Sequence, residues 1–374
     1  MAGEDAAPSL EAMRVLRLLK RHHNVLISGP PAIGKSRLLN EVDRWFRASA
    51  HPGHDPGAAI PLPEGLVITP EQAADWLPSP ERNDRDVFPT AFHPGSKYRD
   101  FLRGLVPKVG SGQEFVVSEG TLIRAAQLGR TEHGAALVII DEINRGPAVQ
   151  VFGDSIVALE RDKRLSPDGD ERTTTQHFEV LDNDGSMKRY SLPYHLYILA
   201  AMNQADTSVE PLDVAFLRRF EPYRLAPNAT VLRQHFGLPD GELPLPEAAT
   251  QAEHVYAASL RAWEQINRRI SLGRGPEYQI GHGVFMDDEA APPPGLAAPA
   301  LESIAAPWRR IRAHVDEVFF GHTRGVAAVL NVGTKNHPLT LTETYFAGDP
   351  VVSLSGEFSS LYQLLLAVAA DDAE

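Results

Sequence analysis

The residues best suited to chemistry lie near the start of the chain, where a glycine-rich loop follows the apolar run 25–28. The loop reads Gly29, Pro30, Pro31, Ala32, Ile33, Gly34, Lys35 and Ser36. This order fits the phosphate-binding pattern G-x-x-x-x-G-K-[ST], which lies between a strand and a helix. Glycines let backbone N–H groups surround phosphate oxygens, and the start of the next helix adds positive charge. We therefore predict that the chain binds a nucleoside triphosphate.

Two side chains of the loop have distinct expected roles. Lys35 would reach the terminal phosphates, and the Ser36 hydroxyl would hold Mg²⁺. A purely structural glycine turn would leave both side chains without a role. The amphipathic segment 38–46 supplies the helix that the pattern requires. The substrate is expected to be GTP or ATP, because no side chain in the sequence distinguishes guanine from adenine.

Further polar residues follow two apolar runs that are typical of strands buried on both faces. The run 135–140 precedes Asp141 and Glu142, and the run 196–201 leads to Asn203. We expect Asp141 to hold the Mg²⁺ shell and Glu142 to orient or deprotonate the attacking water. Asn203 would reach the γ-phosphate or that water. Solvated acids at a strand end and a turn-forming asparagine are the alternatives, which the phosphate loop disfavours.

A pair of arginines, Arg218 and Arg219, follows a short predicted helix. They cannot easily fold back onto the phosphates of their own chain. We predict that they enter the site of a neighbouring subunit as arginine fingers, which contribute about 10³–10⁵ in rate. The alternatives are a solvated basic patch or an ion pair with Asp213 or Glu210.

Strands that alternate with helices predict an α/β fold with a parallel, doubly wound sheet. Strands are expected at 25–28, 87–93, 135–140 and 196–200, and a hairpin at 178–181 and 188–192. Helices are expected at 98–105, 121–128, 149–161, 252–270, 308–319 and 357–369, with β-like runs at 339–346 and 351–354.

The same pattern predicts three regions along the chain. Residues 1–226 form a nucleotide-binding core, with an irregular excursion at 48–86 that includes a short helix at 71–76, and a hairpin insertion at about 165–193. Residues 227–322 form a smaller helical lid domain. Residues 323–374 form a C-terminal extension, to which the sequence assigns no role.

Composition narrows the class of protein. The formal charge of −13 over 374 residues argues against a chain that coats nucleic acid by itself, although 14–21 and 261–274 are locally basic. The lack of cysteine excludes disulfides and thiolate metal sites. The apolar run 361–370 is shorter than the roughly 20 residues of a membrane span, and residues 1–8 resemble no secretion signal. We expect a cytoplasmic protein with no membrane partner.

Five strings together resemble one family, the McrB-like AAA+ NTPases, which are the motor subunits of modification-dependent restriction systems. These strings cover most of residues 10–320, and "DEINR" alone is shared with MoxR-type ATPases. They are the phosphate loop, "FHPGSKYRDF" at 92–101, "IDEINRG" at 140–146 with its continuation to 160, "MNQAD" at 202–206 and "YQIGH" at 278–282.

The resemblance implies a ring of identical subunits, expected to be a hexamer, with nucleotide sites between subunits. Asn144 and Arg145 would lie near that interface, and Arg218 or Arg219 would act across it. The hairpin near Asp184 would face the pore or a partner. The partner would be an McrC-like nuclease, and DNA would be engaged indirectly or through the pore.

Some positions depart from the family pattern. Gln204 and Thr207 replace a threonine and an arginine, and Leu217 shortens the arginine run. The motor begins near residue 10, so target recognition is expected to come from another chain or from the tail, or not to occur. Two other functions stay open: a MoxR-like ATPase that remodels protein complexes, and a nucleotide-switched oligomeric scaffold. Glu142, Asn203 and the paired arginines argue against the scaffold.

Overall fold

The computed structural model describes residues 8–48, 60–61, 67–68, 82–108, 115–205, 212–241, 243–286, 292–334, 337–347, 349–356 and 360–371. The helix predicted at 71–76 lies outside these ranges, as do Asp206 and Thr207. The contacts between residues divide the chain into two units. The sheet unit comprises Met1–Ser28 and Lys35–Arg224, and the helical unit comprises Gly29–Gly34 and Leu225–Glu374.

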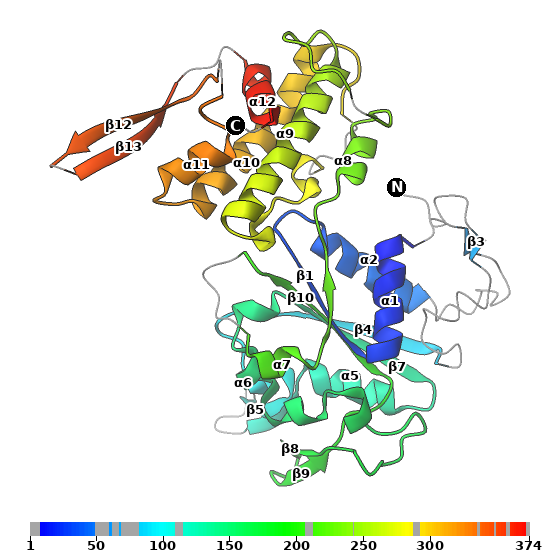
Figure 1. Ribbon diagram of the computed structural model, residues 1–374. Coiled ribbons are helices and arrows are strands. Elements are labelled where there is room, and N and C mark those ends of the chain that lie inside the picture. The colour runs from blue at the N-terminus through cyan, green and yellow to red at the C-terminus, as the bar shows by residue number, and fades with distance from the viewer. Residues whose placement is uncertain are drawn as a thin grey trace. The chain divides into compact units, whose positions relative to one another are not determined.

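The sheet unit is built on five strands in the order β11-β1-β10-β7-β4. The strands are β1 (Asn24–Gly29), β4 (Asp84–Ala91), β7 (Gly134–Asp141), β10 (Leu196–Asn203) and β11 (Glu221–Arg224). Pairing is parallel between β1 and β11, between β10 and β7, and between β4 and β7. This arrangement confirms the predicted α/β fold with a parallel sheet. Figure 1 shows α1 (Leu10–His22) and α2 (Lys35–Ala48) on one face of the sheet and α5 (Thr121–Arg130) on the other.

The central strands form where apolar side chains are continuous. Every residue of β1 is buried, and β7 and β10 are exposed to solvent only at their carboxyl ends. The edge strand β11 was not predicted, because it has four residues, contains Pro222 and alternates between half-buried and exposed positions. The segment is a strand because it pairs in parallel with β1, not because its sequence favours a strand.

Two predicted helices of the sheet unit are wrong in extent. The segment 98–105 forms only α4 (Tyr98–Phe101) and then enters β5 (Arg103–Pro107), which pairs with β6 (Phe115–Glu119). The segment 149–161 forms α6 (Ala148–Phe152), and a 3₁₀ turn follows from Gly153, whose φ of 50° is left-handed. The Tyr98 ring lies where a Cβ of Gly153 would be, so this position requires glycine, and its positive φ ends the helix.

The predicted hairpin insertion is confirmed. Strands β8 (Phe178–Leu181) and β9 (Met187–Tyr190) pair antiparallel around the Asp184-Gly185 turn, where Gly185 takes a φ of 83°. Two further short strands, β2 (Ile60–Pro61) and β3 (Val67–Ile68), pair antiparallel within the excursion. A short helix, α7 (Val214–Leu217), precedes β11.

The helical unit has a core of its own around Trp263. Its elements are α8 (Ala229–His235), α9 (Ala252–Gly273), α10 (Ala297–Val318), α11 (Thr323–Val329), β12 (Thr340–Phe346), β13 (Asp349–Ser355) and α12 (Leu361–Ala369). The extension expected at 323–374 is not separate from it, because Val326, Leu365 and Val368 are buried in the same cluster. Arg269 of α9 donates hydrogen bonds to the carbonyls of Val368 (2.9 Å) and Ala370 (3.0 Å) and so fixes α12 to this core.

Candidate functional site

The phosphate loop connects the carboxyl end of β1 to the first turn of α2. Strand β1 ends at Gly29 and α2 begins at Lys35, so the residues lie in the strand–loop–helix order that the pattern needs. The loop has left-handed backbone at Ala32 (φ 57°) and Gly34 (φ 91°), and Ile33 is buried beneath it. The N–H groups at the start of a helix point along its axis, and they give this end of α2 a partial positive charge, which suits a phosphate.

Backbone contacts hold the loop from the segment Ile280–Gly283. The N–H of Gly281 donates to the Pro31 carbonyl and the N–H of Gly283 to the Ala32 carbonyl, each at 2.9 Å. A Cβ on Gly281 would lie 2.1 Å from the Ala32 oxygen, so only glycine permits this approach. The segment that carries the string "QIGH" therefore holds the phosphate loop in place through backbone hydrogen bonds.

Helix α9 fixes this supporting segment in turn. The Asn267 side chain accepts from the Ile280 N–H (2.7 Å) and donates to its carbonyl (2.9 Å). The Trp263 indole N–H donates to the same carbonyl at 3.0 Å. All three residues are buried. His282 lies within this segment, and its Nδ1 accepts from the Asn228 N–H at 3.3 Å.

Lys35 lies in the electrostatic field of the two acids at the end of β7. Burial lowers the pKa of the Lys35 ammonium, and the charges of Glu142 and Asp141 partly offset that effect. The fold therefore brings the loop lysine and both acids together, although more than one hundred residues separate them along the chain. A half-buried cation near two carboxylates is a local charge arrangement suited to phosphate chemistry.

The backbone at Glu142 is strained. Its φ of 51° and ψ of 45° lie in the left-handed region, which a residue with a Cβ enters at a cost of about 1–2 kcal/mol. Asp141 Oδ1 accepts from the Glu142 N–H at 3.0 Å, and Arg145 Nε lies 3.4 Å from Glu142 Oε2. That Oε2 atom is buried and accepts no hydrogen bond. The turn thus leaves a buried carboxylate oxygen, beside Arg145, with acceptor capacity to spare.

Asn203 lies at the end of β10, where Asn144 anchors the backbone. The Asn144 side chain donates to the Asn203 carbonyl at 2.9 Å, and Asn203 Oδ1 accepts from the Ala205 N–H at 3.3 Å. Asn144 is 6% exposed, and its Oδ1 has no hydrogen-bond partner. The asparagine of "DEINR" therefore joins the two strand ends that carry Glu142 and Asn203.

The structure treats the two arginines differently. Arg219 donates from Nε to the Ile156 carbonyl (2.9 Å), hydrogen-bonds the Ala215 carbonyl and lies 3.9 Å from Glu160 Oε1. Arg218 is exposed at the end of α7. The ion pair of Arg219 is with Glu160, and Asp213, one of the partners considered from the sequence, caps α7 instead.

Comparison with known proteins places these features in a family. Residues 80–220 match the family model of the AAA domain (dynein-related subfamily). The chain is 26% identical over 295 residues to the type IV methyl-directed restriction enzyme EcoKMcrB subunit of Escherichia coli (strain K12). It is 30% identical over 224 residues to the type II restriction enzyme BsuMI component YdiS of Bacillus subtilis (strain 168).

The chain contains an AAA domain and is similar to the McrB-like AAA+ NTPases. The two alignments cover 76% and 57% of it, and they span 52% and 59% of the lengths of the McrB subunit and YdiS. Among solved structures, Caenorhabditis elegans PCH-2 matches 80% of this chain and 67% of its own, with 12% identity and a TM-score of 0.33. A similarity that low carries no functional argument.

Two side chains of the site, Ser36 and Asp141, offer the oxygen donors that Mg²⁺ prefers. Ser36 is exposed in the first turn of α2, and Asp141 ends β7 beside Lys35. Mg²⁺ is commonly held by one or two protein oxygens together with substrate phosphates and water. Within the described ranges, no group of three or more His, Cys, Asp or Glu side chains is placed to hold a metal ion. Nor does any helix in them have the length and apolar character to cross a membrane.

A second polar cluster of the NTPase, which we call the amino-end network, could not be found by motif. Asn24, at the start of β1, donates to the carbonyls of Leu159 (2.8 Å) and Arg219 (3.0 Å). Its Oδ1 accepts from Arg164 (2.6 Å), which is fully buried and also bonds the Leu159 and Leu196 carbonyls. Burial lowers the pKa of Arg164 to about 9. The one signal in the sequence is a polar residue at the head of an apolar strand.

Proposed function

We propose that this chain is the Mg²⁺-dependent, ring-forming motor of an McrBC-like DNA restriction complex that hydrolyses GTP or ATP and acts with a partner nuclease. The observation that carries the hydrolytic part is the placement of Lys35 beside Asp141 and Glu142. The restriction part rests on the two relatives, whose names describe restriction enzymes. The partner nuclease, the ring and the metal are parts of the proposal.

The residues support a direct attack of water on the terminal phosphorus. The loop N–H groups and Lys35 would bind the phosphate oxygens, and Mg²⁺ held by Ser36 and Asp141 would neutralise phosphate charge. Glu142 would accept a proton from the water as its oxygen bonds to phosphorus and the bond to the leaving phosphate oxygen breaks. Asn203 would orient that water.

Of the two arginines, Arg218 is the better fit to a finger that acts on a neighbouring subunit. The Arg219 guanidinium donates to two carbonyls of its own chain and pairs with Glu160, and the Arg219 side chain is only 12% exposed. Arg218 is exposed on the same turn. We therefore assign the trans role to Arg218 and a structural role to Arg219.

Paired substitutions test this assignment. Arg218→Ala should reduce turnover of the assembled protein by about 10³-fold or more and leave the melting temperature unchanged. Arg219→Ala should lower the melting temperature, because it leaves the Ile156 and Ala215 carbonyls without their donor. Steady-state hydrolysis and thermal unfolding measure the two effects. Full turnover in Arg218→Ala would refute the trans role.

The decisive experiment compares steady-state hydrolysis of GTP and of ATP with Mg²⁺, with and without the product of the neighbouring gene. Turnover that this partner stimulates is the expected result. Hydrolysis of ATP alone that ignores the partner would contradict the restriction function and favour a remodelling ATPase. Slow turnover in the assembled ring with the partner present would favour a nucleotide-switched scaffold.

A further inference from the structure

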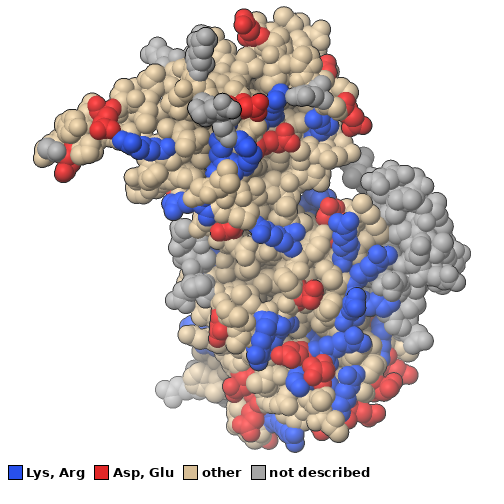
Figure 2. Space-filling model, in the orientation of Figure 1, with Lys and Arg blue, Asp and Glu red and all other residues tan. Residues whose placement is uncertain are grey.

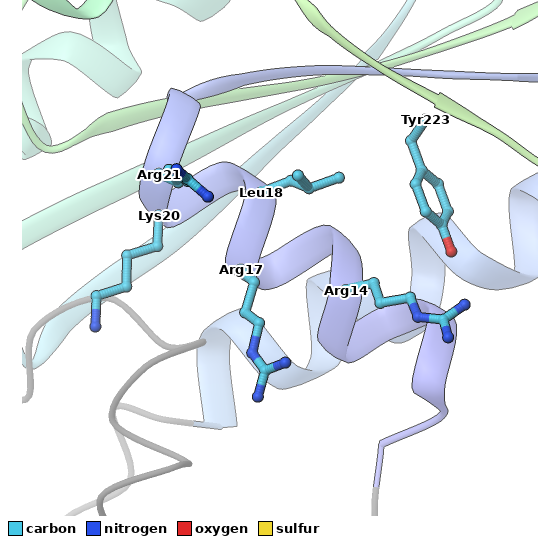
Figure 3. A pocket seen from close by; sticks show the side chains of 6 residues that line it. All are labelled: Arg14, Arg17, Leu18, Lys20, Arg21 and Tyr223. Atoms are coloured by element: carbon cyan, nitrogen blue, oxygen red, sulfur yellow. The ribbon is translucent and has the colours of Figure 1, made fainter.

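One face of α1 in the sheet unit gathers basic side chains around an open cavity. The cavity has a volume of about 650 Å³. Figure 3 shows that Arg14, Arg17 and Lys20 of α1 extend from the helix on this side, with Tyr223 of β11 facing Arg14. The residues that line the cavity are Arg14, Arg17, Leu18, Lys20, Arg21 and Tyr223.

The spacing of α1 makes this exposure obligatory. Ala12, Met13, Val15, Leu16 and Leu19 are all buried against the sheet unit. Arg14, Arg17 and Arg21 recur at intervals of three and four, so they share the opposite, exposed face. From Arg14 to Arg21 the helix rises about 10 Å. The helix therefore presents a row of cations that its own packing cannot bury.

A second set of cations continues this row beyond the end of α1. Arg161 donates to the Arg21 carbonyl at 3.0 Å and to the Tyr194 hydroxyl at 2.6 Å. The guanidinium carbons of Arg161 and Arg172 lie 5.4 and 5.5 Å from the centre of the Tyr194 ring. Figure 2 shows Lys and Arg gathered along this side of the sheet unit. We call Arg14, Arg17, Lys20, Arg21, Arg161 and Arg172 the basic face.

Within the residues that the structure describes, acids near α1 are few, whereas the 160–172 segment carries Glu160, Asp162, Asp168, Asp170 and Glu171. Glu11 acts on Tyr223 electrostatically, and Glu221 lies 3.6 Å from Nδ1 of His22. Near the second set, Asp162 pairs with Lys163 (3.0 Å) and Glu171 lies 3.7 Å from His177. A concentration of six cations is unexpected on a chain with a formal charge of −13, and the fold provides it by placing α1 next to the 161–172 segment.

We propose that the basic face binds the sugar–phosphate backbone of double-stranded DNA without regard to sequence. Duplex DNA presents one negative charge per roughly 1.7 Å of its axis, dense enough to engage cations along the whole row. The forks of the exposed arginines of α1 match phosphate oxygens geometrically, whereas Arg161, whose guanidinium binds the Arg21 carbonyl and the Tyr194 hydroxyl, adds positive charge. An acidic protein fits less well, because stable protein interfaces centre on apolar side chains. Of the six residues that line the cavity, four are cationic and only Leu18 and Tyr223 carry no positive charge.

This contact goes beyond the proposed function, which assigns hydrolysis to other residues and needs no DNA contact on this surface. It also concerns a different observable. DNA binding is measured without nucleotide, and hydrolysis is measured without DNA. Loss of one therefore says nothing about the other, so failure of the DNA proposal and failure of the NTPase proposal are distinguishable.

The test uses the full chain and fluorescence anisotropy with a labelled 30-base-pair duplex of arbitrary sequence, between 50 and 200 mM NaCl. The double variant Arg17→Gln, Arg21→Gln removes two cations of the basic face. The matched control is Arg309→Gln, Arg312→Gln, which removes two cations from α10 of the helical unit. The first variant should bind about tenfold more weakly, with the salt slope reduced by about 2, and the control should bind like the wild type.

Three outcomes would overturn the proposal. The first is no affinity loss in the Arg17, Arg21 variant, and the second is an equal loss in the control, which would indicate a general effect of net charge. The third is binding of poly-glutamate that weakens in the same variant while duplex binding does not, which would identify an acidic polypeptide as the partner. Unchanged melting temperature and unchanged basal hydrolysis in both variants exclude misfolding as the cause.

Discussion

Two buried polar clusters of the sheet unit differ in how completely their hydrogen bonds are satisfied. In the amino-end network, Asn24 makes three hydrogen bonds, and Arg164 binds Asn24 and two carbonyls. At the carboxyl ends of β7 and β10, Glu142 Oε2 and Asn144 Oδ1 are buried without a hydrogen bond, and Glu142 has a left-handed backbone. His23, beside the amino-end network, is also buried without a side-chain hydrogen bond and has a φ of 68°. The unsatisfied groups at the strand ends differ because they lie near Lys35 of the phosphate loop, as is typical of a site prepared for a ligand.

The largest expected effect separates catalysis from stability at the unsatisfied cluster. Glu142→Gln should keep nucleotide binding, lower turnover by about 10²–10⁴-fold, trap assembled rings and leave the melting temperature nearly unchanged. Lys35→Ala should instead abolish binding, because it removes the cation beside the two acids. Binding of a fluorescent nucleotide and steady-state hydrolysis separate the two. Retained turnover in Glu142→Gln would rule out Glu142 as the general base.

The opposite result is expected in the satisfied cluster. Asn24→Ala removes the donor to two carbonyls and the acceptor of Arg164, so the free energy of unfolding should fall by about 2–3 kcal/mol. Asn40→Ala, at an exposed position of α2, is the matched control and should change it little. Urea unfolding measures both variants. Equal stability of the two would mean that the network contributes nothing to the fold.

His23 follows α1 and lies beside the amino-end network. We expect it to make the free energy of unfolding depend on pH. Burial, followed by the charges of Arg164 and Arg161, lowers its pKa from 6.5 to about 2. The unfolded chain therefore binds a proton below pH 6.5 that the folded chain rejects. Stability should be full above pH 6.5 and fall by up to about 1.4 kcal/mol per pH unit below it, or about 2 kcal/mol by pH 5.

His23→Asn isolates this contribution, because it removes the group that titrates. Its unfolding free energy should depend less on pH between 6.5 and 5 than that of the wild type, measured as urea midpoints across the range. His133→Asn, at an exposed position, should retain the wild-type dependence. If His23→Asn and the wild type lose stability in parallel, the acid sensitivity originates elsewhere.

The smallest expected effect concerns how the phosphate loop is supported. Gly281→Ala would place a methyl group 2.1 Å from the Ala32 carbonyl oxygen and force the loop to shift. Overpacking of this kind costs about 1–3 kcal/mol, so nucleotide binding should weaken about tenfold. In the control, Gly273→Ala, the nearest atom is the edge of the Phe319 ring at 3.2 Å, which can move. Isothermal titration calorimetry measures the nucleotide affinity of both variants. Equal affinities would mean that Gly281 does not control the shape of the phosphate loop.

Prediction from sequence succeeded where neighbouring residues decide the outcome. The apolar runs of β1, β7 and β10 and the Asp-Gly hairpin are encoded locally, so their positions followed from the sequence. Prediction failed at β11, whose order comes from pairing with β1, and at Gly153, whose positive φ ends a helix that periodicity favours. The helix predicted at 98–105 failed because its second half pairs with β6.

The sequence alone determined the chemistry that the chain offers. The phosphate loop, the Asp141–Glu142 pair and Asn203 are each recognisable because the elements that carry them are contiguous. Only the tertiary structure decided that Arg219 binds carbonyls of its own chain. It also decided which groups the buried Asn24 and Arg164 bind, and which cations lie beside those of α1. The physical reason is that these properties depend on contacts between residues far apart in the chain, and no local pattern encodes them.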